Sequence, residues 1–191
     1  TVALFVASNS IVSALFGYGF FSETSVQNSA LALFYFAFGL PAFALIKVFS
    51  SFFFARHDTK TPFYISLVSV LFNVIISVTL FQKLGFIIIP IATSISSWLN
   101  AIALYIFSRK RKFFIFNDIF IYRFPRILFS SLITGLIFYL LLDLLNFKLI
   151  YSESLKLVYL LLCISITLIC YLLISIFTKA FKMSDIKLNY K

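Results

Sequence analysis

Charged residues are scarce in this 191-residue chain, and its long apolar runs contain almost none of them. Only 12% of the residues are charged and 62% are hydrophobic, whereas a soluble globular domain is about 25% charged. The mean hydropathy is correspondingly high, at +1.08. A soluble domain of useful size is therefore excluded, and functional groups must lie among the few polar residues inside the apolar runs.

Cysteine and acidic residues are also few. The two cysteines, Cys163 and Cys170, lie seven residues apart in one apolar run, where they fit as small packing residues. No cluster of Cys and His has the spacing of a metal site. The six acidic residues never fall two to a run, and the chain has neither a Ser/His/Asp set nor a phosphate-binding glycine loop. The sequence therefore argues against an enzyme and predicts no metal site.

The apolar runs are long enough to cross a membrane as helices. A hydrocarbon core about 30 Å thick needs roughly 20 mostly apolar helical residues. The runs lack the alternation of a transmembrane barrel, so we predict an all-α, polytopic transmembrane helix bundle. The first run is short and is expected to be the end of a longer span. The predicted spans are residues 2–16, 29–54, 63–81, 87–107, 127–145 and 155–177, and residues 179–191 form a polar tail.

The basic residues predict the orientation of these spans. If the runs cross alternately, twelve of the 16 basic residues lie on one side, three on the other, and Lys47 lies within a run. The excess marks the cytoplasmic side, which includes the C-terminus. The net charge of +10 is gathered at helix ends rather than on one continuous face, so we expect the lipid bilayer, and not nucleic acid, as a partner. The residues of the basic side are Arg56, Lys60, Arg109, Lys110, Arg111, Lys112, Arg123, Arg126, Lys179, Lys182, Lys187 and Lys191.

Lys47 is a cation inside an apolar run. It precedes Arg56 by nine residues, which places it about 13 Å deeper along a continuous helix. Either it faces a cavity, or the span ends near Val48 and the side chain snorkels to the interface. Ser50 and Ser51 share its helical face, so Lys47, Ser50 and Ser51 are our candidate cavity residues.

Two neighbouring runs carry polar stripes at helical spacing. Such stripes most often pack two helices together through hydrogen bonds. The alternative is a hydrophilic cavity wall, or a set of oxygen ligands for a monovalent cation. The first stripe contains Ser66, Ser69, Asn73 and Ser77, and the second contains Thr93, Ser96, Ser97 and Asn100. The candidate wall or cation-site residues are Asn73, Ser77, Thr93, Ser97 and Asn100.

The loop R-H-D-T-K-T-P, residues 56–62, is dense in charge. Pro62 suits the first turn of the next helix, and Thr61 is expected to cap it. The loop either anchors the topology or forms a cytoplasmic gate, in which Asp58 pairs with a basic residue as the bundle moves. Arg56, Asp58 and Lys60 are the candidate gate residues.

Several motifs resemble those of the MurJ/MviN lipid II flippases. They are L-F-G-Y-G-F-F at 15–21, G-L-P-A-F at 39–43, K-V at 47–48, F-F-A-R-H-D-T-K-T-P at 53–62 and A-T-S-I-S-S-W-L-N-A at 92–101. The resemblance extends over about residues 10–112. It implies the C-terminal part of a 14-helix, two-lobe transporter of the multidrug/oligosaccharidyl-lipid/polysaccharide exporter superfamily. Residues 1–145 would end the second lobe and add the first terminal helix, residues 146–178 would form the last span, and 179–191 a cytoplasmic tail.

The resemblance implies a function in bacterial cell-wall biosynthesis, namely flipping of the lipid-linked peptidoglycan precursor by alternating access in the plasma membrane. The implied partners are this precursor, the bilayer and a missing N-terminal lobe, and Lys47 would face the head group. No resident cofactor is expected. Some members hold a cation site that Asn73 and Thr93 match, although Ser77 stands where an acidic ligand would be. The alternatives are a related exporter of other lipid-linked oligosaccharides or small cations, and a truncated fragment without function.

Overall fold

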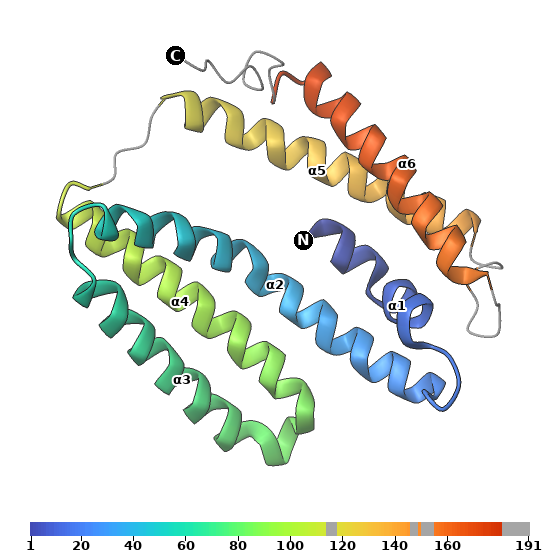
Figure 1. Ribbon diagram of the computed structural model, residues 1–191, viewed down its shortest axis with the longest axis horizontal. Helices are drawn as coiled ribbons and strands as arrows, with labels where there is room; N and C mark the ends of the chain where they lie inside the picture. The colour runs from blue at the N-terminus through green and yellow to red at the C-terminus, as the bar shows by residue number, and fades with distance from the viewer. Residues whose placement is uncertain (114–117, 146–148, 150–154, 181–191) are drawn as a thin grey trace. The chain divides into compact units, whose positions relative to one another are not determined.

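The computed structural model describes residues 1–113, 118–145, 149 and 155–180. Every regular element in these ranges is helical, which confirms the predicted all-α, polytopic helix bundle (Figure 1). The elements are α1 (Val2–Phe16), α2 (Glu23–Phe54), α3 (Lys60–Leu84), the 3-10 turn η1 (Gly85–Ile87), α4 (Ile88–Lys110), α5 (Asp118–Leu144) and α6 (Lys156–Phe177).

The helices have the length and composition of membrane spans. Four helical stretches of the described chain are long and apolar enough to cross a bilayer: Glu23–Phe54, Lys60–Lys110, Tyr122–Leu144 and Lys156–Phe177. The second turns back at η1, so that α3, with 25 residues, and α4, with 23, are each long enough to cross. Helix α1 has 15 residues and is shorter than a span. The chain is therefore a multi-pass membrane protein.

Three helices begin earlier than the apolar runs, α3 by three residues and α2 and α5 by more. Helix α2 starts at Glu23 rather than at residue 29, because its polar first turns are helical and the Ser22 hydroxyl accepts a bond of 3.2 Å from the Ser25 amide. Helix α5 starts at Asp118 rather than at 127 and continues through Pro125. Hydropathy marks the apolar part of a helix and not its polar ends. Residues 146–148, 150–154 and 181–191 of the predicted last span and tail lie outside the described residues.

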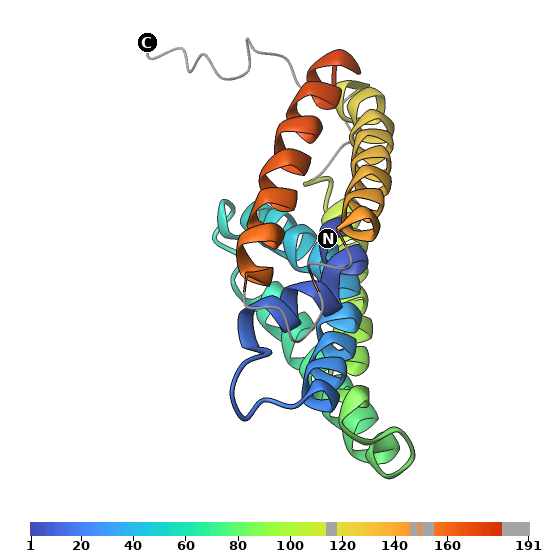
Figure 2. The same cartoon turned by 90° about the vertical axis from the view of Figure 1, so that its right-hand side faces the viewer.

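The chain divides into two compact units, each described here by itself. The first, Asn28–Ile115 with Thr1, contains most of α2 together with α3, η1 and α4. In both views α3 and α4 lie side by side (Figures 1 and 2). Phe49, Phe53 and Leu104 form a buried cluster that joins the last third of α2 to α4.

Helices α2 and α4 also approach closely in the middle of this unit. A Cβ added at Gly39 would lie 3.1 Å from the Ser94 hydroxyl oxygen, so glycine permits the contact. The Ser94 hydroxyl donates to the Tyr35 carbonyl at 2.6 Å, and the Trp98 indole donates to the Phe38 carbonyl at 2.9 Å. Backbone oxygens of α2 thus hold α4 in register.

The second unit, Val2–Gln27 with Phe116–Lys191, contains α1, α5 and α6. Helices α5 and α6 lie side by side, and α1 packs against both (Figures 1 and 2). Gly135 on α5 lies against Val2, with no room for a Cβ. The buried core of the unit contains Ala7, Ala14, Phe138, Leu142, Leu149, Leu160 and Cys163.

Candidate transport site

The polar stripes of α3 and α4 face each other. The Asn73 amide donates to the hydroxyls of Thr93 and Ser96, at 3.1 Å each, and its oxygen accepts from Ser77 at 3.2 Å. One end of this network is thus centred on Asn73, which bonds three other residues of the predicted stripes, Ser77, Thr93 and Ser96.

A second bond crosses the same interface nearer to the start of α3. The Asn100 amide donates to the Ser66 hydroxyl at 3.3 Å. Pairing of residue 73 with 93 and 96, and of 66 with 100, shows that the two helices are antiparallel. Ser97 is buried but donates to the Thr93 carbonyl of its own helix, at 2.7 Å, and among the described residues it makes no hydrogen bond to α3. The stripes therefore pack α3 against α4, and the Asn100 oxygen remains buried without a partner among the described residues.

Lys47 lies within a helix that continues to Phe54, so the helix itself does not end near Val48. The Lys47 side chain is exposed on the surface of the first unit, on the opposite side of α2 from Phe49 and Phe53. In the described part of the chain it has no hydrogen bond or ion pair.

The two serines predicted beside Lys47 do not complete a site with it. Ser51 donates to the Val48 carbonyl of its own helix at 2.7 Å, and Ser50 is half-buried. Lys47 thus presents an ammonium group on an exposed and mostly apolar helix face, where Leu40, Phe43 and Phe54 are also exposed.

The charged loop is built from two helix caps. After the end of helix α2, His57 adopts the left-handed backbone conformation, with φ of 57°. The His57 amide donates to the Phe54 carbonyl, and the Asp58 amide donates to the Phe53 carbonyl, at 3.0 Å each. This is a Schellman motif. The Asp58 carboxylate then accepts from the Thr61 amide at 3.0 Å and from its hydroxyl at 2.8 Å. The prediction that Thr61 caps α3 is wrong: Thr61 lies inside the helix, Thr59 holds the N-cap position without a side-chain bond, and the Asp58 carboxylate bonds an amide of the first turn.

Asp58 also ties the loop to the end of α4. Its carboxylate forms an ion pair with Arg111, and these two side chains are 19% and 44% exposed, so the pair is at the surface. The Thr61 amide and hydroxyl, followed by Arg111, hold the pKa of Asp58 below its usual range.

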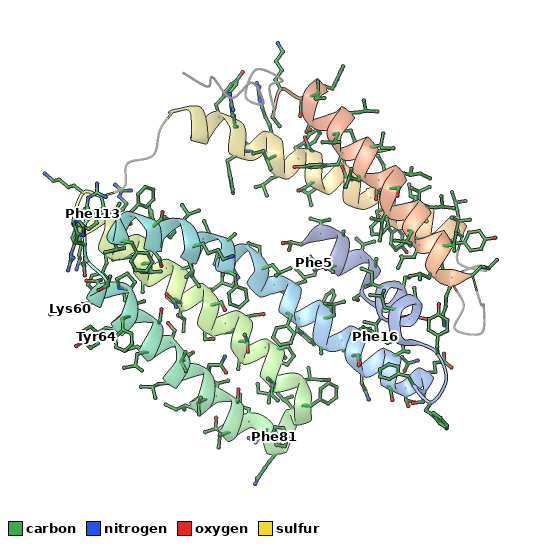
Figure 3. The ribbon with its side chains drawn as sticks, in the orientation of Figure 1. Phe5, Phe16, Lys60, Tyr64, Phe81 and Phe113 are labelled. Carbon is green, nitrogen blue, oxygen red and sulfur yellow. The ribbon has the colours of Figure 1, made fainter. Side chains whose placement is uncertain are left out.

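Aromatic contacts complete the cluster at this end of the unit. The Arg56 guanidinium lies 4.3 Å from the centre of the Phe113 ring, and Phe113 packs edge-on against Phe53 at 5.5 Å. Lys60 lies at the same end as Phe113, away from Phe81 (Figure 3), but has no hydrogen bond within the described residues. Of the three predicted gate residues, the structure gathers Arg56 and Asp58 and leaves Lys60 apart.

Sequence reasoning missed two members of this cluster, Arg111 and Phe113. Phe113 is the first apolar residue after the basic run 109–112, and its amide bonds the Ser108 carbonyl at 2.8 Å. The first apolar residue after a helix end is the signal that could have found it, since a Schellman motif places such a residue back against its own helix.

Comparisons with known proteins agree with this fold. The family model described as "Lipid II flippase MurJ" matches residues 1–160. Relatives described as "Probable lipid II flippase MurJ" include one from Rickettsia prowazekii (strain Madrid E), 37% identical over 111 residues, which are 58% of this chain and 22% of the relative. Another, from Rhizobium meliloti (strain 1021), is 37% identical over 147 residues, 77% of this chain and 28% of the relative. A third, from Rhizobium tropici, is 35% identical over 136 residues, 70% of this chain and 25% of the relative.

The chain thus spans between 22% and 28% of the length of these relatives, about a quarter. The family match extends over 160 of its 191 residues, far more than the charged loop and the polar stripes alone. The chain belongs to the lipid II flippase MurJ family.

Proposed function

We propose that this chain supplies part of the membrane path of a flippase that moves the lipid-linked peptidoglycan precursor across the bacterial plasma membrane by alternating access. The cargo of such a flippase has an anionic head and a long apolar tail. Its path needs a cationic, polar surface within the bilayer beside apolar helix faces. The proposal is supported by the family match and, in this chain, by Lys47.

Lys47 is the observation that carries the proposal. A lysine at the centre of a lipid-facing helix costs about 2.5–3.5 kcal/mol or more. Helix α2 is continuous past this residue, and the first unit leaves the side chain exposed. We therefore infer that this face of α2 borders water or an anionic ligand rather than lipid tails, as a head-group path requires.

The chain covers about a quarter of its relatives, so the test uses a chimera. The chain replaces the matching part of the Rhizobium meliloti relative, and the chimera is introduced into cells depleted of their own flippase. We expect the chimera to restore growth and K47A to abolish or strongly reduce that restoration, with K47R retaining part of it. K83A is the control, because Lys83 is an exposed residue in the last turn of α3.

Two outcomes would count against the proposal. Full growth with K47A, at unchanged abundance in the membrane fraction, would remove the cargo role of Lys47. Growth restored by the 191-residue chain alone would contradict the proposal that the chain supplies only part of the path. Failure of both the chain and the chimera to restore growth would instead favour a truncated fragment without function.

We propose further that flipping here is transport without an enzymatic step, because the cargo crosses without a covalent bond being made or broken. No resident cofactor is required by this scheme. The oxygens at Asn73, Ser77 and Thr93 are engaged in hydrogen bonds with one another or with their own helices, which supports a packing role for the stripes over a monovalent cation site. The precursor and the rest of a two-lobe transporter are the partners that the scheme implies.

The proposed orientation places the charged loop of residues 56–62 and the C-terminus in the cytoplasm. The excess of basic residues on that side supports this orientation. In it, Asp58 and Arg111 form a tie at the cytoplasmic end of the first unit, where Arg56 and Lys60 are also exposed.

A further inference from the structure

Lys156 is a buried cation in the second unit that the proposed path does not use. It is the first residue of α6 and only 1% exposed. Its ammonium donates to the Gly17 carbonyl at 2.6 Å and lies 4.3 Å from the centre of the Tyr18 ring. Gly17 directly follows the last residue of α1, so this contact joins the end of α1 to the start of α6.

The position of Lys156 is unfavourable within its own helix. A helix N-terminus carries a partial positive charge and favours acidic residues, and the first turn of α6 contains none. Burying a cation is also costly unless it is bonded. The contact with α1 offsets the repulsion at the helix N-terminus and the cost of burying the ammonium. The last carbonyls of a helix carry partial negative charge, and the face of an aromatic ring attracts a cation.

The end of α1 is shaped for this ammonium group. A Cβ added at Gly17 would lie 2.5 Å from the Ser13 carbonyl oxygen and 3.1 Å from the Lys156 nitrogen. The Gly17 amide itself bonds the Ser13 carbonyl at 2.9 Å, which completes the last turn. Any larger residue at position 17 would therefore displace the chain or the ammonium.

The contact lies at the end of an apolar seam between the same helices. Ala14 on α1 and Leu160 and Cys163 on α6 belong to one buried cluster. Burial of apolar surface alone favours helix contact only weakly in a membrane, because lipid tails are as apolar as the helix faces. A directional bond at the end of the seam can fix how far one helix has slid along the other.

We propose that Lys156 is an interhelical tie: its ammonium, held by the Gly17 carbonyl and the Tyr18 ring, fixes the register of α6 on α1 and the point at which the chain leaves α1. It is a positioning residue, and its role does not depend on the cargo.

Amine labelling of the purified 191-residue chain in mild detergent tests the tie without any mutation. Acetylation by a water-soluble ester is followed at each lysine by mass spectrometry. We expect Lys156 to react at least about tenfold more slowly than the exposed Lys83, since reaction requires local opening of the contact. Equal rates at the two lysines would overturn the proposal.

A thermal double-mutant cycle tests the partners. K156M keeps the length of the side chain but removes its donor, and we expect it to lower the melting temperature by roughly 5 °C. G17A displaces the same ammonium, so the double variant should melt little below the less stable single variant. G19A is the matched control, because a Cβ at Gly19 meets nothing within 4 Å. Its effect should add to that of K156M, and full additivity of G17A with K156M would contradict the tie.

Discussion

Three described residues other than glycine adopt the left-handed backbone conformation, and all three follow helices. His57 has φ of 57°, Lys112 of 56° and Lys179 of 55°. His57 and Lys112 each occupy the position after a helix end where the Schellman motif favours glycine. The chain has only five glycines, and these two ends carry a histidine and a lysine instead.

Glycine at either position should stabilise the first unit. H57G and K112G each remove the clash of a Cβ in left-handed backbone, and we expect each to raise the free energy of unfolding by about 0.5–1 kcal/mol. A44G, at an exposed position inside α2, should lower it by about 1 kcal/mol. Thermal unfolding in detergent measures all three, and a loss of stability in H57G and K112G would contradict the motif.

Asp58 should make the stability of the charged loop depend on acid pH. Its pKa is lowered in the fold, first by the Thr61 amide and hydroxyl and then by Arg111. Because the pKa is lowered, the carboxylate contributes its full stabilisation above its pKa in the unfolded chain, near pH 4. This stabilisation is lost as the pH falls through the pKa of the folded state. D58A should therefore be less stable than the parent chain at pH 7, and this difference should disappear toward pH 2.

The variant D58N separates the cap from the ion pair. Asparagine is as good a cap as aspartate, but it carries no charge for Arg111. We expect D58N to retain most of the stability that D58A loses at pH 7, because the asparagine oxygen can still accept the bond from the Thr61 amide. A D58N variant as unstable as D58A would make the ion pair with Arg111 the dominant interaction. Melting temperatures recorded between pH 2 and pH 7 distinguish the two results.

At the scale of the helices, the sequence predicts interiors better than ends or partners. The apolar runs indicate each span, because burial in lipid needs continuous apolar residues. They do not show the start of α5 at Asp118, since Arg123, Pro125 and Arg126 interrupt the apolar run there. Spacing places Asn73 and Ser77 on one stripe, but only the structure shows which hydroxyls of α4 the amide reaches.

The gate and cavity residues show the same limit. Motif and charge point to Asp58, yet its partner Arg111 lies 53 positions away, and no local pattern encodes that distance. The fold shows that the Lys47 side chain is exposed. What would surround this side chain in a full-length relative lies outside the quarter of the relatives' length that this chain covers.

The Asn73 network should stabilise the α3–α4 pair. N73A removes two bonds to α4, each worth about 0.6 kcal/mol in a membrane helix bundle, so we expect a loss of about 1 kcal/mol. S69A is the control, because Ser69 is buried on the same stripe but bonds only the Ile65 carbonyl of its own helix. Unfolding in detergent measures both losses. Equal losses would show that the interhelical bonds contribute nothing.

The same variants test the monovalent cation. If the stripes are packing elements, replacing sodium with potassium or choline leaves the melting temperature of the parent chain unchanged. Stabilisation by sodium that N73A abolishes and S69A retains would instead establish a cation site at this network.

For the molecule as a whole, sidedness follows from how the first unit is folded. Because α3 and α4 are antiparallel, Lys60 and Lys110 come to one end and Lys83 to the other, near η1. Figure 3 shows this separation through Lys60 and Phe113 at one end and Phe81 at the other. A lipid bilayer around these helices must place the two ends on opposite sides, and the more basic end is the one that we propose lies in the cytoplasm.

Cysteine labelling in intact cells tests that orientation. Cys163 and Cys170 are first replaced by alanine, and K83C and K110C are then introduced singly. A membrane-impermeant maleimide should label K83C in intact cells, and K110C only after the cells are permeabilised, because only the η1 end is expected outside. A reporter fused after Lys191 should be active only if it is cytoplasmic. The reverse labelling pattern would invert the topology, and it would place the Asp58–Arg111 tie on the outer face, where it could not gate entry of a cargo made in the cytoplasm.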